Sequence, residues 1–251
     1  MKAPSNFRGI SVEKYKELIS LNPEDFESTF EFRLERLSII LDEDAEELGE
    51  RLTVEELTDL TKKTAWINKR IKGEFLEKFC VFEFKKFELL TLGEFIDLEH
   101  YFENGYYLNI EKILSILYRK TKKDEHGNKI FEPYRFDIEE RKKEFLNFSI
   151  LNAQYVIDSY LRYREFFISK RKTLFKDEES EEIEEEENEP KTREEIEEEK
   201  KEKIFERWSW EFLIWKICKG DLTKIEQVTE LNLILVFNFE AMKKELNVKE
   251  F

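Results

Sequence analysis

One segment of this chain decides how the rest is organised: residues 176–202 read KDEESEEIEEEENEPKTREEIEEEKKE. The segment carries sixteen acidic side chains against five basic ones, a net charge of −11, whereas the whole chain of 251 residues carries −15. A dense block of like charge repels itself and resists collapse. We therefore predict an acidic linker over residues 176–191, between a helical body over residues 1–175 and a C-terminal helical segment over residues 192–251.

The composition outside this segment predicts a folded, mainly helical protein. Apolar residues make up 40% of the chain and include 23 phenylalanines, while only seven glycines and four prolines are present. Scarce turn residues favour long elements. The predicted fold class is mainly α: a multi-helix bundle with one or two small β-hairpins, an acidic spacer and a C-terminal helical subdomain.

Helix-start signals recur along the chain. Asn22 followed by Pro23 predicts a helix whose buried stripe is Phe26, Phe30, Leu34, Leu37 and Leu41. Capping boxes are predicted at Thr53 with Glu56, Thr91 with Glu94, and Asp137 with Glu140. A long helix is expected from Ser149 to about Phe175, another from Thr192 to a stop at Gly220, and a last one over residues 231–246.

Two segments break the helical period. Gly73 ends the preceding pattern, and Phe82, Phe84 and Phe87 then follow at spacings that are not helical. We predict a β-hairpin or a pair of short strands near residues 75–90. The polar stretch around His126 and Gly127 predicts an exposed hairpin near residues 118–133.

The residues that catalysis requires are scarce. The sequence has two histidines, His100 and His126. No glycine-rich phosphate loop, CxxC pair or nucleophile elbow occurs. Cys80 and Cys218 lie far apart in apolar surroundings, which predicts buried, reduced thiols, with a disulfide as the alternative. We therefore expect no enzyme, no catalytic residues, no cofactor and no metal.

The N-terminal residues and the apolar runs predict a cytoplasmic chain. No apolar run follows Lys2, so no secretory signal is predicted. The longest apolar run, residues 231–237, is far too short to span a membrane.

Aromatic side chains supply the candidate protein interfaces. Trp208, Phe212 and Trp215 share one helix face, and Trp210 lies off it. Two interpretations stay open: all four residues form core, or Trp210 belongs to a protein interface, where tryptophan is enriched. The helix from Ser149 is aromatic on several sides, which predicts burial of more than one face and adds Tyr160, Tyr163 and Phe167.

Basic side chains cluster in one short stretch, namely Lys62, Lys63, Lys69, Arg70 and Lys72, with a second group at residues 170–172. They form a solvated helix face, or they face a nucleic acid or the acidic block itself. The acidic block makes nucleic acid an unlikely main partner, because phosphate binding needs clustered lysine and arginine.

Several stretches resemble a known group of proteins: LTLGEFIDLE at residues 90–99, ILSILYRK at 113–120, residues 134–141, and GDLTK at 220–224 followed by Val228 and Asn232. Together they are similar to poorly characterised virion-morphogenesis proteins of large tailed bacteriophages, the crAss-like phages included. The resemblance covers roughly residues 26–245 apart from the acidic spacer.

The resemblance implies a non-enzymatic structural or assembly protein of the head-to-tail or tail apparatus. Its partners would be other phage structural proteins in a ring or larger oligomer, and it would reside in the virion, or in the host cytoplasm during assembly. One alternative is a transient assembly chaperone that is absent from the mature particle. Another is an acidic host-directed inhibitor that mimics nucleic acid, which requires carboxylates fixed at phosphate-like spacing.

Overall fold

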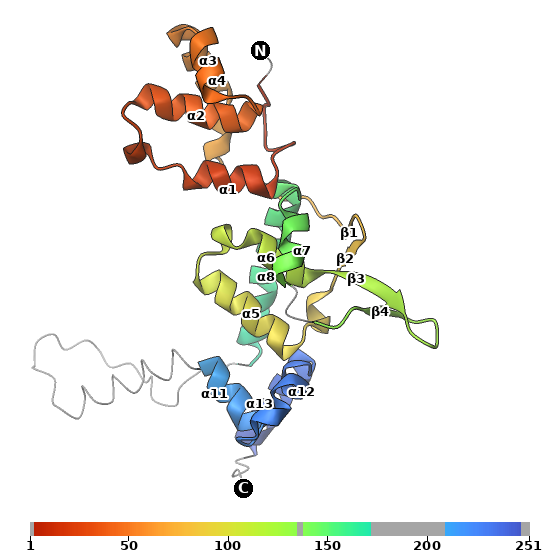
Figure 1. The fold of residues 1–251 in the computed structure, drawn as a ribbon. Helices are drawn as coiled ribbons and strands as arrows, with labels where there is room; N and C mark the ends of the chain where they lie inside the picture. Colours follow the sequence, from red (N-terminus) through yellow and green to blue (C-terminus); the bar gives the residue numbers. More distant parts are fainter. Residues whose placement is uncertain (1–2, 135–137, 172–208, 247–251) are drawn as a thin grey trace, which may run out of the picture. The chain divides into compact units, whose positions relative to one another are not determined.

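The computed structural model describes residues 3–134, 138–171 and 209–246, and these are mainly helical with one small antiparallel sheet (Figure 1). The prediction of a mainly α chain with small β-hairpins is confirmed. The predicted linker over residues 176–191, Asp137 and Trp208 lie outside the described residues.

The chain divides into two compact units. Unit 1 comprises residues 1–85 and 100–162, and unit 2 comprises residues 86–99 and 163–251. The C-terminal helices therefore share a unit with a segment from the middle of the predicted body.

Unit 1 begins with short helices that enclose a leucine core. They are α1 (Val12–Ser20), η1 (Pro23–Asp25), α2 (Thr29–Leu41), α3 (Ala45–Arg51), α4 (Val54–Lys63) and η2 (Ala65–Asn68). Thr53 and Glu56 form the predicted capping box at the start of α4. The buried cluster consists of Leu34, Leu37, Leu48, Leu57 and Leu60.

The predicted start of α2 is wrong by several residues. Asn22 caps only the three-residue 3-10 turn η1, and Ser28 then caps α2, with its hydroxyl accepting from the backbone N–H of Glu31 at 3.2 Å. A second cap close downstream competes with the first one, and α2 begins at the later position. Phe30 consequently stays partly exposed rather than in the buried stripe.

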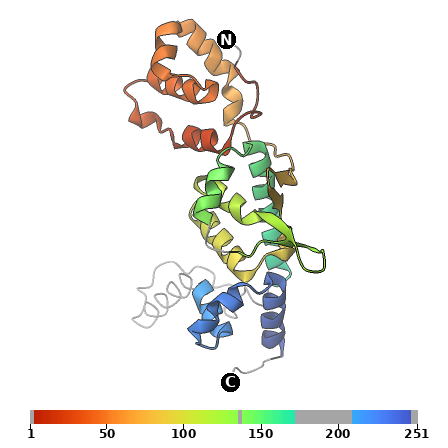
Figure 2. The same ribbon diagram turned by 45° about the vertical axis from the view of Figure 1, so that its right-hand side comes forward.

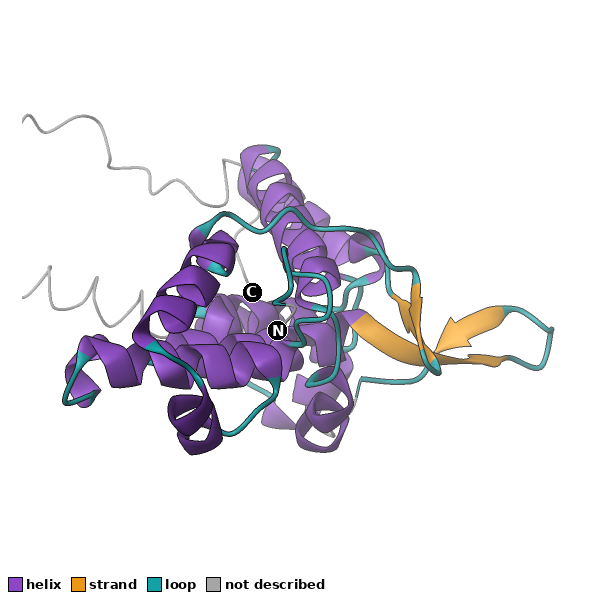
Figure 3. Cartoon of the chain, turned by 90° about the horizontal axis from the view of Figure 1, so that it is seen from above, coloured by secondary structure: helices purple, strands orange, loops and turns teal. Residues whose placement is uncertain are grey.

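The sheet of unit 1 joins both predicted hairpins (Figure 3). Its strands are β1 (Lys78–Phe79), β2 (Phe82–Phe84), β3 (Tyr118–Lys123) and β4 (Lys129–Phe131), all antiparallel in the order β1-β2-β3-β4. Strand β2 pairs with β3, with Phe82 opposite Lys120 and Phe84 opposite Tyr118. The sequence pattern predicted the two hairpins separately. It did not predict that β2 of one hairpin pairs with β3 of the other.

The prediction of buried thiols is wrong for one cysteine. Cys218 is buried, but Cys80 is exposed in the turn between β1 and β2, and both thiols are free. Cys80 takes a positive φ of 51°. The tight turn therefore decides its exposure, although its sequence neighbours are apolar.

Unit 1 is completed by the last part of α5 (Leu92–Glu103), η4 (Tyr106–Leu108), α6 (Ile110–Leu117), α7 (Ile138–Phe145) and the first part of α8 (Ile150–Ser169). Aromatic rings join them to the sheet: Tyr118 lies 5.2 Å from Phe148 and 6.0 Å from Phe145 between ring centroids. All three residues are fully buried. Helix α8 ends at Ser169, earlier than the predicted end near Phe175.

Unit 2 combines η3 (Phe87–Leu89), the first part of α5 (Leu92–Glu103), the last part of α8, and α11 (Ser209–Ile217), η5 (Leu222–Lys224), α12 (Ile225–Thr229) and α13 (Leu233–Glu245). The helices α11, α12 and α13 lie together (Figure 2). Gly220 provides the predicted stop after α11, with a φ of 75° and its N–H donating to the Trp215 carbonyl at 3.0 Å.

Both units pair two helix starts in the same way. In unit 1 the N–H of Val12 donates to the Phe148 carbonyl at 2.8 Å, and the N–H of Ile150 donates to the Ile10 carbonyl at 3.0 Å. These bonds form an antiparallel bridge between Ser11 and Ser149, the residues immediately before α1 and α8. We call this arrangement a paired helix start.

The paired helix start of unit 2 joins α5 to α13. The N–H of Leu92 donates to the Leu231 carbonyl, and the N–H of Leu233 donates to the Leu90 carbonyl, both at 2.9 Å. The bridge residues are Thr91, which forms the predicted capping box with Glu94, and Asn232. The first N–H of a helix has no partner within the helix, so each pair satisfies two otherwise unpaired donors.

Gly73 lies against the backbone of α8, and an alanine there should destabilise unit 1. A Cβ at residue 73 would overlap the backbone nitrogen and Cα of Tyr155. We expect Gly73→Ala to lower the free energy of unfolding by about 3 kcal/mol. Urea denaturation followed by circular dichroism measures this change.

Gly49→Ala is the matched control, because its Cβ would meet only the flexible end of Leu34 at 3.2 Å. Alanine is also the better helix former there. Its unfolding free energy should stay within about 0.5 kcal/mol of wild type. Equal stabilities for the two variants would show that residue 73 does not contact α8.

Candidate protein-interaction site

Helix α13 is apolar on two nearly opposite sides. One side buries Leu233, Val236 and Phe237 within unit 2. The other side carries side chains that recur every three or four residues and are 44–65% exposed, namely Leu235, Phe239, Met242 and, just after the helix, Leu246. We call these four residues the α13 outer stripe.

The inner side of α13 is fixed by several contacts, so the helix cannot simply turn its outer stripe inward. The ring of Phe237 lies 5.3 Å from that of Phe167 and 6.3 Å from that of Phe95. Arg171 donates to Asn238 at 2.8 Å. Its guanidinium also lies 4.0 Å from the centroid of the Phe167 ring, a favourable cation–π geometry.

The start of α13 is held by Asn232. Its side-chain oxygen accepts from the N–H of Leu235 at 3.2 Å, which caps the helix. Its side-chain nitrogen donates to the Glu88 carbonyl at 2.9 Å. One asparagine thus satisfies a helix donor and ties α13 to the segment before α5.

Helix α11 carries three residues of the predicted aromatic cluster. One side of the helix packs within unit 2, and the other side is exposed. Trp210 is half-buried, with its ring edge-on to Phe95 at 5.5 Å. Phe212 and Trp215 share the other face, stacked at 5.8 Å, and are 44% and 53% exposed. Trp210 therefore packs inside unit 2, and the exposed part of the cluster is Phe212 with Trp215.

The three aromatic candidates on α8 contribute to packing in this structure. Tyr160 is fully buried in unit 1, with its ring 5.0 Å from that of Phe102. Phe167 is buried in unit 2. Tyr163 is half-buried, with its ring 5.2 Å from that of Phe87.

The hydroxyl of Tyr163 is enclosed and makes no hydrogen bond to any residue that the structure describes. Burial and the nearby charge of Glu88 raise the pKa of Tyr163 to about 12. This side chain therefore stays neutral at physiological pH, and its ring serves the packing of unit 2.

The outer stripe of α13 was not among the residues that the sequence singled out. Its signal is nevertheless present in the sequence, because apolar residues occupy both helical stripes between residues 233 and 242. Which stripe faces outward depends on the pairing of Asn232 with Thr91, and that pairing is not visible in local spacing.

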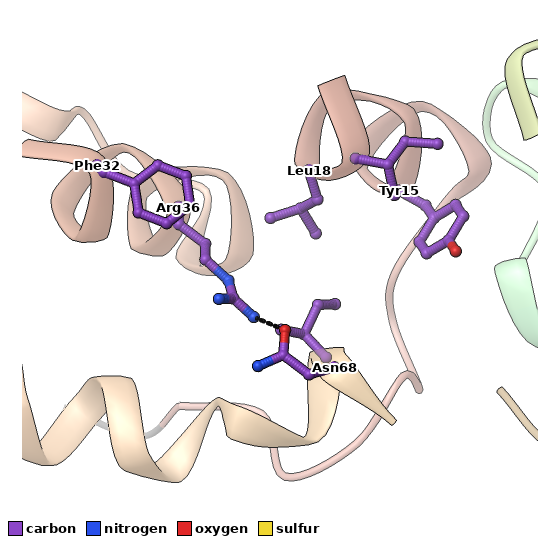
Figure 4. Close-up of a pocket in the computed structure, with 7 residues that line it drawn as sticks. Tyr15, Leu18, Phe32, Arg36 and Asn68 are labelled. Atoms are coloured by element: carbon purple, nitrogen blue, oxygen red, sulfur yellow. Dashed lines mark hydrogen bonds between the residues drawn. The ribbon is translucent and has the colours of Figure 1, made fainter. Parts of the chain in front are cut away.

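Unit 1 contains a small hollow between α1, α2 and η2, with a volume of about 200 Å³ (Figure 4). Its walls are Tyr15, Leu18, Ile19, Phe32, Arg36, Ile67 and Asn68. We call it the Arg36 hollow, because Arg36 crosses it and donates to the Asn68 side-chain oxygen at 2.7 Å. Burial lowers the pKa of Arg36, and burial together with Tyr106 raises the pKa of Tyr15.

Residues 3–134, 138–171 and 209–246 include no helix with the length and apolar character that crossing a membrane requires. The same residues hold no group of three or more His, Cys, Asp or Glu side chains placed to bind a metal ion. Comparison of the chain with protein-family models, with curated proteins and with solved structures finds no match.

Removing the Asn232 side chain should loosen the start of α13. Asn232→Ala loses the cap and the bond to Glu88, and we expect the free energy of unfolding to fall by about 2 kcal/mol. Asn22→Ala is the matched control, because Asn22 caps only η1 through Glu24, and it should cost about 0.5 kcal/mol. Thermal and urea unfolding of both variants measure the difference, and similar losses would contradict the role of Asn232.

Proposed function

We propose that this protein is a non-enzymatic structural or assembly component of a tailed bacteriophage particle, and that it binds another protein of the particle through the α13 outer stripe. The stretches at residues 90–99, 113–120 and 220–224 support the phage context through their resemblance. The observation that carries the binding proposal is the exposure of Leu235, Phe239 and Met242 on a helix whose opposite side is already buried.

The physical reason is the cost of leaving these side chains in water. Burying a large apolar side chain contributes roughly 1.5–3 kcal/mol, and a helix that is apolar all round is normally buried on all sides. Phenylalanine and methionine are enriched in protein interfaces. Phe239 and Met242 are therefore suitable anchors, and the exposed pair Phe212 and Trp215 supplies further aromatic surface.

A charge on the outer stripe should prevent assembly without unfolding the chain. Phe239→Glu would bring a carboxylate into the apolar contact, and we expect incorporation into particles to fall at least about tenfold. The matched control is Glu245→Gln, an exposed polar position on the same helix, which should incorporate like wild type. Tagged copies supplied during infection and counted by mass spectrometry in purified particles measure this.

Three outcomes separate the proposed roles. Wild-type protein at a fixed copy number in the particle, lost with Phe239→Glu, supports a structural component. Abundance in the lysate, absence from the particle, and Phe239-dependent binding to a particle protein indicate an assembly chaperone. Equal incorporation of Phe239→Glu and Glu245→Gln would contradict binding through the outer stripe, and binding only to a host protein would contradict the phage role.

A further inference from the structure

The guanidinium of Arg36 has donor capacity that the protein does not use. An arginine carries five N–H donors and no acceptor, and among the described residues Arg36 makes one hydrogen bond, to Asn68. Among the described residues, no carboxylate lies within 4.0 Å of it. A half-buried arginine in this state is suited to bind a carboxylate from another molecule.

The surroundings of the Arg36 hollow favour an acidic ligand. Residues 60–73 contain five basic residues and no acidic one, in a chain that is acidic overall. Ile67 and Asn68, which belong to the same stretch but are uncharged, line the hollow. Lys63 is paired with Asp59 at 2.7 Å, and the described residues supply no ion pair to Lys69 or Arg70.

The size and walls of the hollow restrict the ligand further. Pockets for cofactors and drug-sized molecules usually enclose about 300–1,000 Å³, and this hollow measures about 200 Å³. Leu18, Phe32 and Ile67 make one part of the wall apolar, and Arg36 and Asn68 make another part polar. A single aliphatic side chain with a carboxylate next to it matches this combination.

The chain itself encodes such a ligand twice. The sequence Glu-Glu-Ile-Glu-Glu-Glu occurs at residues 181–186 and again at residues 194–199. In each copy one isoleucine, Ile183 or Ile196, is flanked by glutamates on both sides. No other segment of the chain repeats this pattern.

We propose that the Arg36 hollow of one copy binds a Glu-Glu-Ile-Glu-Glu-Glu segment of a second copy, with the isoleucine between Leu18 and Phe32 and a glutamate on Arg36. The contact joins unlike surfaces, so it is heterologous, and such contacts build rings when the rotation closes. The inference goes beyond the proposed function, because it concerns a different surface and self-association rather than a partner.

Sedimentation velocity of the full chain over a range of concentrations tests the proposal. Wild type should associate, and association should weaken as salt rises, because salt screens charge pairs. Arg36→Glu should weaken association at least about tenfold. Arg162→Glu is the matched control, because Arg162 is exposed and, within the described part of the chain, bonds only Ser159. It should behave like wild type.

A second variant leaves Arg36 intact and removes the ligand. Replacing the ten glutamates of the two repeats by glutamine should abolish association. Mixing this variant with Arg36→Glu should restore a dimer, because one copy supplies the hollow and the other supplies the acidic segment.

The proposal is overturned by any of three results: a monomer at every concentration and salt, association that neither variant changes, or a loss that mixing does not restore. The last result would mean that the segment binds within its own chain. None of these variants changes the α13 outer stripe. A negative result in this experiment therefore says nothing about binding through that stripe, which the particle-incorporation experiment tests.

Discussion

The paired helix start is the interaction on which both units depend. A helix leaves its first N–H groups without partners, and in this protein two helices supply each other's missing acceptors through the residues before their caps. The four carbonyls belong to Ile10, Phe148, Leu90 and Leu231. An apolar residue stands on either side of the bridge residue in all four cases: Ile10-Ser11-Val12, Phe148-Ser149-Ile150, Leu90-Thr91-Leu92 and Leu231-Asn232-Leu233. Seven of these eight flanking side chains are buried. The bridge residues therefore stand between side chains of the hydrophobic core.

In unit 2 this constraint determines which side of α13 is available for binding. Once Leu233 is bonded to Leu90, the side of α13 that carries Phe237 faces Phe95 and Phe167. The opposite apolar side then remains exposed. The candidate interface is therefore a consequence of how the helix begins.

Features with a local cause were predictable from the sequence, and features that depend on distant segments were not. The capping boxes at Thr53 and Thr91, the stop at Gly220 and both hairpins follow from a few neighbouring residues. The pairing of β2 with β3 and both paired helix starts join segments far apart in the chain, which spacing alone does not reveal. The start of α2 was missed because two caps compete, and the exposure of Cys80 because a turn overrides its apolar neighbours. For the candidate site, the spacing of Phe212 and Trp215 showed that they share a face, but not that this face points outward.

Residue-resolved hydrogen exchange by NMR tests the paired helix start most directly. We predict that the amides of Val12, Ile150, Leu92 and Leu233 exchange as slowly as amides inside their helices, because each donates to a carbonyl outside its helix. Ala45 and Val54 begin α3 and α4 without such an acceptor, and their amides should exchange rapidly. Equally rapid exchange at all six positions would contradict this claim. The bonds of the paired helix start would then not be what fixes the orientation of α13.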